Sequence, residues 1–142
     1  MRWVWLVLGL AACGSIDLGD TAPVADPLID EDFFYCRIMP EVIVAHGCAS
    51  GMAGESCHAS TSALFLDPAA EAEVPPTCEG NAVVGPVPES WERNLEAARF
   101  TLRSDPYASP FLLRPIGVMN HERTIFEDGS PEANLIVEWL TP

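Results

Sequence analysis

The chain of 142 residues contains no lysine, and its seven basic residues are all arginine. Its 21 aspartate and glutamate residues give a formal net charge of −14 and a sequence pI of about 4.3. Phosphate recognition depends on clustered cations, so this deficit excludes a nucleic-acid binder that works through a basic surface. It also disfavours adhesion to an anionic membrane leaflet by charge alone.

The apolar run near the N-terminus is too short to span a bilayer, which needs about 20 residues. It covers only Trp3 to Ala12, after the single positive charge of Arg2. A positive start, a short apolar core and small residues before a cut are typical of a secretory signal. The segment Leu10-Ala11-Ala12-Cys13 resembles a bacterial lipoprotein lipobox, in which the cysteine is lipidated and becomes the new N-terminus. The alternatives are an ordinary secretory signal with a chance cysteine, and a buried N-terminal strand.

We therefore expect a lipoprotein signal peptide over residues 1–12 and a membrane anchor formed by acyl chains on Cys13. The resemblance to known lipoprotein sorting, with no aspartate after Cys13, implies the outer membrane of a cell envelope, facing the periplasm or the surface. Export would place the other four cysteines in an oxidising compartment, where they form disulfides or carry a covalent cofactor. Four cysteines allow three pairings, and the sequence does not choose among them.

The chain has no internal repeat and no segment that alternates long enough to predict a β-sheet. Residues 14–32 contain six acidic residues, two prolines and no apolar periodicity. This composition predicts a flexible acidic tether over residues 13–32 that holds the following domain off the membrane.

Three later segments have the apolar spacing of amphipathic helices. The first begins at Phe33, and Pro40 should kink or restart it. The second is predicted over Trp91–Arg103 with Ser90 as its N-cap, and the third over Pro131–Leu140 with Ser130 as its N-cap. Trp91 and Trp139 lie on apolar stripes and are predicted to be core residues. Residues 33–142 therefore predict a small, loop-rich, all-α domain.

The segment from Cys48 to Cys57-His58 places eight residues between two cysteines, with a histidine directly after the second. Covalent haem attachment requires this arrangement, because two thiols add across the vinyl groups and the histidine becomes the proximal ligand of the iron. The usual motif is Cys-x-x-Cys-His. The Gly-, Ser- and Ala-rich spacer found here is able to bulge outward while both thiols still reach the edge of the ring.

These residues resemble small cytochrome c-like domains of bacterial exported lipoproteins. The resemblance rests on Phe33 to Pro40, Gly47 to Ser50, Cys57-His58, Ser109 to Gly117, His121, Phe126 and Trp139-Leu140. It implies a haem c domain that transfers electrons to a redox protein partner and is not an enzyme. It also implies that the first and last helices cross, with Phe34 or Ile38 near Leu135 or Trp139. The long spacer departs from the family pattern. Glu122 and Arg123 also depart from it, because glycines often follow the downstream histidine in the family.

The resemblance also implies the residues of the site. Cys48 and Cys57 would attach the haem, and His58 would be the proximal ligand. The opposite ligand would be His121, which matches a histidine of the family, or Met119. These two residues are two positions apart, so in an extended segment both side chains point the same way and periodicity does not choose between them. With Cys48 and Cys57 committed to haem, Cys36 and Cys78 would remain to form a disulfide.

Two other interpretations stay open at this point. The first is a haem-less lipoprotein on the same scaffold, with a structural or binding role and with disulfides Cys48–Cys57 and Cys36–Cys78. The second is a zinc site formed by His46, Cys48, Cys57 and His58, whose ligand types suit tetrahedral zinc although their spacing matches no common pattern. The sequence contains neither Gly-x-Ser-x-Gly nor His-Glu-x-x-His, so no enzymatic activity is predicted.

Overall fold

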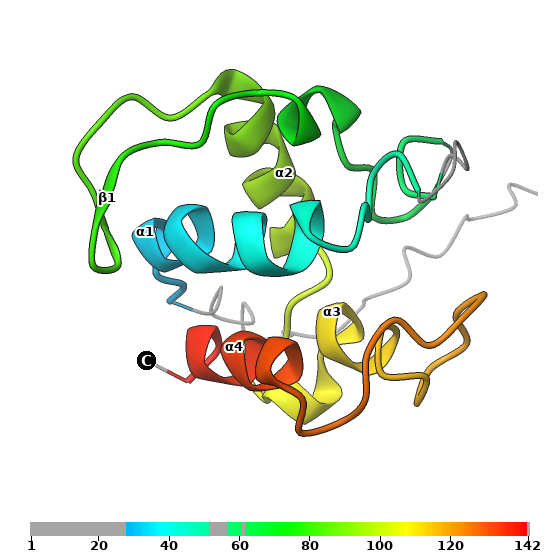
Figure 1. Ribbon diagram of the computed structural model, residues 1–142. Helices are drawn as coiled ribbons and strands as arrows, with labels where there is room; N and C mark the ends of the chain where they lie inside the picture. The colour runs from blue at the N-terminus through cyan, green and yellow to red at the C-terminus, as the bar shows by residue number, and fades with distance from the viewer. Residues whose placement is uncertain (1–27, 52–56, 61, 142) are drawn as a thin grey trace, which may run out of the picture.

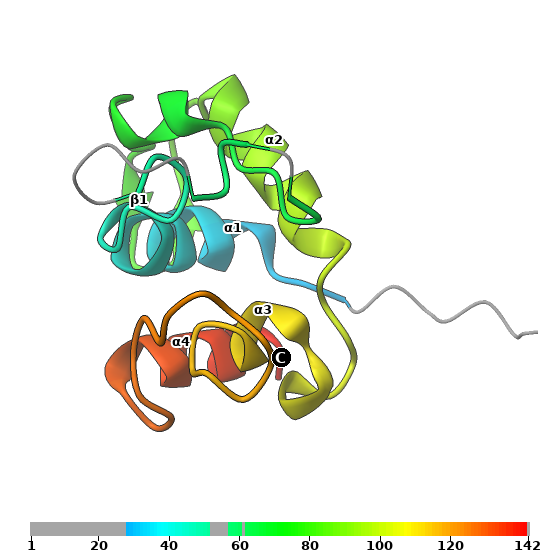
Figure 2. The ribbon, with the colours of Figure 1, turned by 90° about the vertical axis from the view of Figure 1, so that its right-hand side faces the viewer.

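The computed structural model of this chain describes residues 28–51, 57–60 and 62–141. The predicted signal peptide, Cys13 and most of the predicted tether lie outside the described residues. The elements follow one another as α1 (Glu31–Phe33), η1 (Phe34–Val44), η3 (Pro68–Glu71), β1 (Cys78–Glu79), β2 (Ala82–Val83), α2 (Glu89–Arg99), η4 (Pro106–Ala108), α3 (Pro110–Leu113) and α4 (Pro131–Trp139). The continuous helix formed by α1 and η1 lies between α2 on one side and α3 with α4 on the other (Figures 1 and 2).

The first helix is continuous from α1 into η1. It begins at the N-cap Asp30, whose side chain accepts a hydrogen bond of 2.9 Å from the Phe33 backbone N–H. The helix therefore starts inside the stretch predicted to be tether. Pro40 was predicted to kink or restart this helix, but η1 runs through it as a π-helix. In an α-helix, a proline ring clashes with the carbonyl group four residues before it. The hydrogen bonds of a π-helix reach back five residues instead, so its wider turn moves that carbonyl away from the ring.

The last helix begins as predicted. Ser130 caps α4, and its hydroxyl oxygen accepts a hydrogen bond of 3.2 Å from the Ala133 N–H. The start of α2 differs from the prediction, because Pro88 occupies the N-cap position and the buried Ser90 hydroxyl donates to Glu73 instead. The end of α2 also comes earlier, at Arg99, where Thr101 closes a tighter turn onto the Ala98 carbonyl.

The prediction of an all-α fold is wrong, because β1 and β2 form a two-stranded antiparallel sheet. Cys78 lies opposite Val83, and Glu79 lies opposite Ala82, so Gly80-Asn81 forms the turn between them. Gly80 has a φ of 63°, a left-handed conformation that glycine adopts without steric cost. Two-residue strands are too short to produce an alternating pattern, so the described domain is mixed and loop-rich rather than all-helical.

A disulfide joins Cys36 of η1 to Cys78 of β1, with their Cα atoms 5.9 Å apart. It connects two elements that are 42 residues apart in the chain. The short hairpin is thereby attached to the central helix through a covalent bond rather than through an extended sheet.

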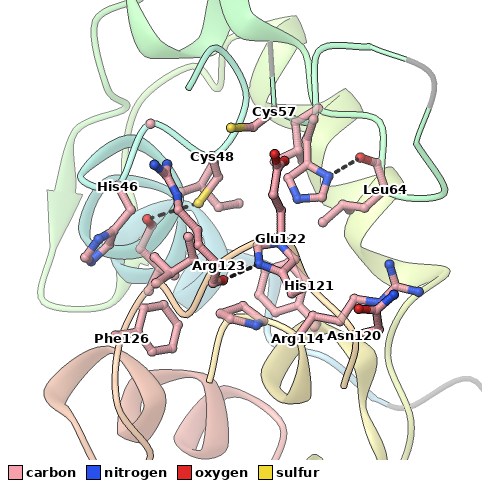
Figure 3. Close-up of a pocket in the computed structure, with 18 residues that line it drawn as sticks. His46, Cys48, Cys57, Leu64, Arg114, Asn120, His121, Glu122, Arg123 and Phe126 are labelled. Atoms are coloured by element: carbon pink, nitrogen blue, oxygen red, sulfur yellow. Dashed lines mark hydrogen bonds between the residues drawn. The ribbon is translucent and has the colours of Figure 1, made fainter. Parts of the chain in front are cut away.

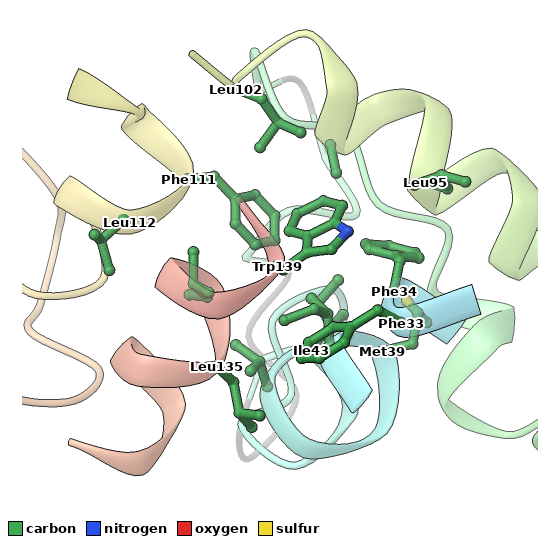
Figure 4. Packing of buried hydrophobic residues seen from close by; sticks show 14 of the residues in the cluster. Phe33, Phe34, Met39, Ile43, Leu95, Leu102, Phe111, Leu112, Leu135 and Trp139 are labelled. Carbon is green, nitrogen blue, oxygen red and sulfur yellow. The ribbon is translucent and has the colours of Figure 1, made fainter. Parts of the chain in front are cut away.

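The core lies where η1 crosses α4. The rings of Phe34 and Trp139 have centroids 5.2 Å apart, and Phe111 of α3 packs on Trp139 at 5.7 Å. Figure 4 shows Trp139 between these two phenylalanines. The predicted crossing of the first and last helices is confirmed. Trp91 and Trp139 are each 1% exposed, which also confirms them as core residues.

Candidate functional site

A cavity of about 620 Å³ opens beside the C-terminal end of η1. Cys48, Cys57 and His58 line it from the loop after η1, and Arg114 and His121 line it from the segment after α3. Figure 3 shows the two cysteine sulfurs on one side and His121 on the other. Residues predicted from separate parts of the sequence to form one site therefore share a single cavity.

The two loop ends that carry the cysteines meet directly. The backbone N–H of His58 donates to the carbonyls of Cys48 and Ala49, both at 3.1 Å, and the Ala59 N–H donates to Ala49 at 3.0 Å. The long spacer therefore starts and ends at the same place. Both cysteines line one cavity despite this spacer, and their attachment to haem stays a prediction.

Glu71 of η3 fixes the backbone just after Cys48. Its carboxylate accepts hydrogen bonds from the N–H groups of Ala49 at 3.0 Å and Ser50 at 3.1 Å, and from the Ser50 hydroxyl. The sequence does not mark Glu71 as a site residue. It lies about 20 positions from its partners in a Pro-rich connection, and no local pattern distinguishes it from the chain's other carboxylates.

The rings of His58 and His121 lie together although 63 residues separate them in the sequence. Their centroids are 6.0 Å apart and their planes differ by 21°. A metal–nitrogen bond of about 2 Å to each ring would place the two nitrogens about 4 Å apart and the ring centres about 6 Å apart. The structure thus brings together the two predicted axial ligands, and their ligation stays a prediction.

Both histidines use Nδ1 to bind a backbone carbonyl. His58 Nδ1 lies 2.9 Å from the Leu64 oxygen, and His121 Nδ1 lies 2.6 Å from the Arg123 oxygen. Because a carbonyl only accepts, Nδ1 of each ring carries a proton, so Nε2 is the nitrogen that would be left to bind a metal. This is how metal-binding histidines are usually oriented by the residues around them.

Burial lowers the pKa of His58, and the neighbouring His121 and Arg114 lower it further, against the opposing effect of the bond to Leu64. The ring is therefore held in its neutral form. Neutral imidazole is the form that binds a metal.

Cys48 and Cys57 are both free, partly buried thiols. The Cys48 thiol donates a hydrogen bond of 3.7 Å to the Val42 carbonyl. Burial raises the pKa of this thiol to about 12, with a smaller contribution from Glu71. The structure contains the Cys36–Cys78 disulfide but not the Cys48–Cys57 disulfide of the haem-less interpretation.

Two of the arginines that the structure describes, Arg114 and Arg123, line the cavity without a described carboxylate partner. Arg103, which does not line this cavity, has no described carboxylate partner either. Arg37, Arg93 and Arg99 each form an ion pair with a carboxylate. Arg114 and Arg123 form none with any described carboxylate, although acidic residues outnumber basic ones three to one (21 against 7). In the sequence, Arg123 is distinguished only as a departure from the family pattern. Glu122 also lines the cavity, so two cations and one carboxylate face it, and this balance suits a ligand with negative groups.

Met119, the second candidate for the distal ligand, is 37% exposed and is not among the residues that line the cavity. Its neighbours Asn120 and His121 do line it. The geometry therefore favours His121 over Met119 as the partner of His58.

The zinc alternative gains no support from the part of the chain that the structure describes. There, no three His, Cys, Asp or Glu side chains are grouped so that they alone hold a metal ion. Nε2 of His46 lies 3.6 Å from the Glu132 carboxylate, and its ring packs against Phe126.

No protein-family model, curated protein or solved structure matches this chain. The resemblance to cytochrome c-like lipoprotein domains therefore stays a prediction from the sequence. Within the described residues, no helix has the length and apolar character needed to cross a membrane.

Proposed function

We propose that this chain is an exported lipoprotein whose cavity holds one covalently attached haem c and exchanges single electrons with a protein partner. One observation carries the proposal. The His58 and His121 rings lie 6.0 Å apart, and each donates its Nδ1 proton to a backbone carbonyl. That arrangement leaves two Nε2 lone pairs for axial ligation of one iron.

The other residues of the cavity fit this group. Cys48 and Cys57 offer the two free thiols that covalent attachment needs. A volume of about 620 Å³ lies within the range of small-molecule and cofactor sites, roughly 300–1,000 Å³. The guanidinium groups of Arg114 and Arg123 suit the two carboxylates of a porphyrin.

Haem c, when bound, supplies reversible one-electron chemistry. The protein's own residues hold and tune it. With His58 and His121 as its ligands, the haem would have a lower reduction potential than with a His/Met pair. Leu64, Leu66 and Phe111 add apolar surface to the lining of the cavity.

The test is expression of the full chain with a haem-maturation system, followed by an absorption spectrum and an intact mass. We expect a Soret band that persists after denaturation and a mass raised by one haem. A variant with Cys48→Ala and Cys57→Ala should lose covalent attachment. A mass reduced by the hydrogens of two disulfides, without a Soret band, would contradict the proposal and favour the haem-less structural or binding role.

The axial ligands have their own matched pair of variants. His121→Ala should change the haem spectrum to that of a five-coordinate or weakly ligated iron, whereas Met119→Ala should leave it as in the wild type. The reverse result would assign the distal position to Met119.

We also propose that the chain is anchored in the outer membrane through acyl chains on Cys13. This proposal rests on the lipobox-like sequence, because residues 1–27 lie outside the described residues. Cys13→Ser should abolish acylation and leave the precursor uncleaved. Normal processing and detergent partitioning of that variant would contradict the anchor.

A further inference from the structure

An apolar groove of about 630 Å³ runs along the outer side of α2. Phe65 and Phe100 line it and are 55% and 79% exposed, respectively. Ala63 and Ala97 extend the same apolar surface. Figures 1 and 2 show α2 as the outer layer, on the side of η1 away from α4. Two large aromatic side chains thus face solvent together, which is typical of an interaction surface.

Carboxylates surround this groove. Asp67, Glu89, Glu92 and Glu96 line it together with one basic residue, Arg93. Arg93 is already engaged with Asp67 and Glu89, each at 2.6 Å. Glu92 forms no ion pair with any described residue, so the rim keeps a net negative charge beside an apolar centre.

The groove also adjoins the histidine pair. A second cavity, of about 350 Å³, is lined by His58 and His121 together with Ala63 and Phe100. Ala63 and Phe100 therefore border both the groove and the cavity beside the histidines. A molecule bound in the groove would therefore contact residues that also line the cavity beside the histidines.

We propose that the groove around Phe65, Ala97 and Phe100 docks a lysine-rich protein that exchanges electrons with this chain. The electron exchange rests on the proposed function, whereas the docking does not. Charge complementarity identifies the occupant as basic, because the rim and the whole chain, at −14, are acidic. A small apolar centre with a charged rim suits a transient complex, which rim charges accelerate and salt weakens.

The experiment uses the full chain, isotopically labelled in detergent micelles, with a small lysine-rich cytochrome c as the probe. At low ionic strength, NMR shifts should concentrate at Phe65, Ala97 and Phe100 and fade as salt is added. The double variant Glu92→Gln/Glu96→Gln should weaken association roughly tenfold, since rim charges act mainly through electrostatic steering. Phe100→Ser should weaken it at every salt concentration.

The matched control is Glu79→Gln/Asp128→Asn, which makes the same change in net charge at two exposed carboxylates outside the groove. It should leave association within about twofold of the wild type. Equal losses in both double variants, or shifts centred on another face, would overturn the docking proposal. The NMR shifts report binding of the probe whether or not this chain carries haem. A haem-less protein that still binds the probe at the groove would therefore contradict the proposed function and leave the docking proposal standing.

Discussion

At the scale of single residues, burial changes the acid–base behaviour of Tyr35. The side chain is 7% exposed and packs edge-on against Phe34, with ring centroids 5.6 Å apart. Burial, with a smaller effect from Glu31, raises its pKa from 10.0 to about 12. The folded state therefore keeps the phenol neutral at a pH where the unfolded chain has already lost the proton.

We predict that this group's contribution to stability is complete below pH 10 and is lost as the pH rises from 10 towards 12. Urea unfolding at a series of pH values measures the loss, and tyrosinate absorbance reports the ionisation. Tyr35→Phe is the control, because it keeps the ring and removes the titrating group. An equally steep alkaline loss in Tyr35→Phe would show that other groups cause it.

Gly117 holds a conformation that other residues tolerate poorly, and it lies in the segment that brings His121 to the cavity. Its φ is 77°, and an added Cβ would lie 2.6 Å from the Thr124 hydroxyl oxygen. Gly129 has nearly the same φ, 76°, but no atom lies within 4 Å of its added Cβ. The pair therefore separates backbone strain from steric overlap.

We predict that Gly129→Ala costs roughly 1–2 kcal/mol, the strain of a left-handed residue with a side chain. Gly117→Ala should cost more, because the methyl group also displaces Thr124. Chemical denaturation measures both. Equal costs for the two variants would mean that the contact with Thr124 relaxes freely.

At the scale of elements, Trp139 joins the last helix to the first. Its ring packs on Phe34 of η1, and its indole N–H donates a hydrogen bond of 2.8 Å to the Asp30 carbonyl at the start of α1. The Trp139 side chain of α4 therefore makes an apolar contact with η1 and also a hydrogen bond to the start of α1. We expect its loss to affect both helices.

We predict that Trp139→Ala costs roughly 3–5 kcal/mol, as large truncations in a core do. Trp139→Phe keeps an aromatic ring and loses the bond to Asp30, so it should cost less. Urea unfolding monitored by circular dichroism gives both values. If Trp139→Ala proved no worse than Trp139→Phe, the contact between η1 and α4 would matter less than the hydrogen bond.

At the scale of the whole molecule, the Cys36–Cys78 disulfide closes a loop across 42 residues. In the chain-entropy model such a crosslink contributes about 4 kcal/mol, a large part of the stability of a small domain. We predict that Cys36→Ser/Cys78→Ser loses about this amount and that its melting temperature falls. Cys48→Ser/Cys57→Ser is the matched control in the haem-free chain, because it removes two free thiols and no crosslink.

The sequence by itself determined the parts that depend on neighbouring residues. The Ser130-Pro131 start of α4 and the burial of Trp91 and Trp139 follow from caps and apolar spacing, and the structure has them as predicted. Cys48, Cys57 and His58, which the sequence pattern predicts to hold haem, line one cavity, and their role there stays a prediction. The hairpin at Gly80-Asn81 was not predicted, because its strands of two residues are too short to produce an alternating pattern.

Only the tertiary structure decided the contacts between distant segments. It brought His121 to His58, set Glu71 against the backbone after Cys48, and left Arg114 and Arg123 at the cavity without a described carboxylate partner. It also carried η1 through Pro40 as a π-helix. The family resemblance had implied His121 opposite His58, and the π-helix at Pro40 is a local change of hydrogen bonding. The contacts of Glu71 and of the two arginines follow from no local pattern, because they depend on how separate elements pack, and burial rather than sequence spacing fixes which side chains meet.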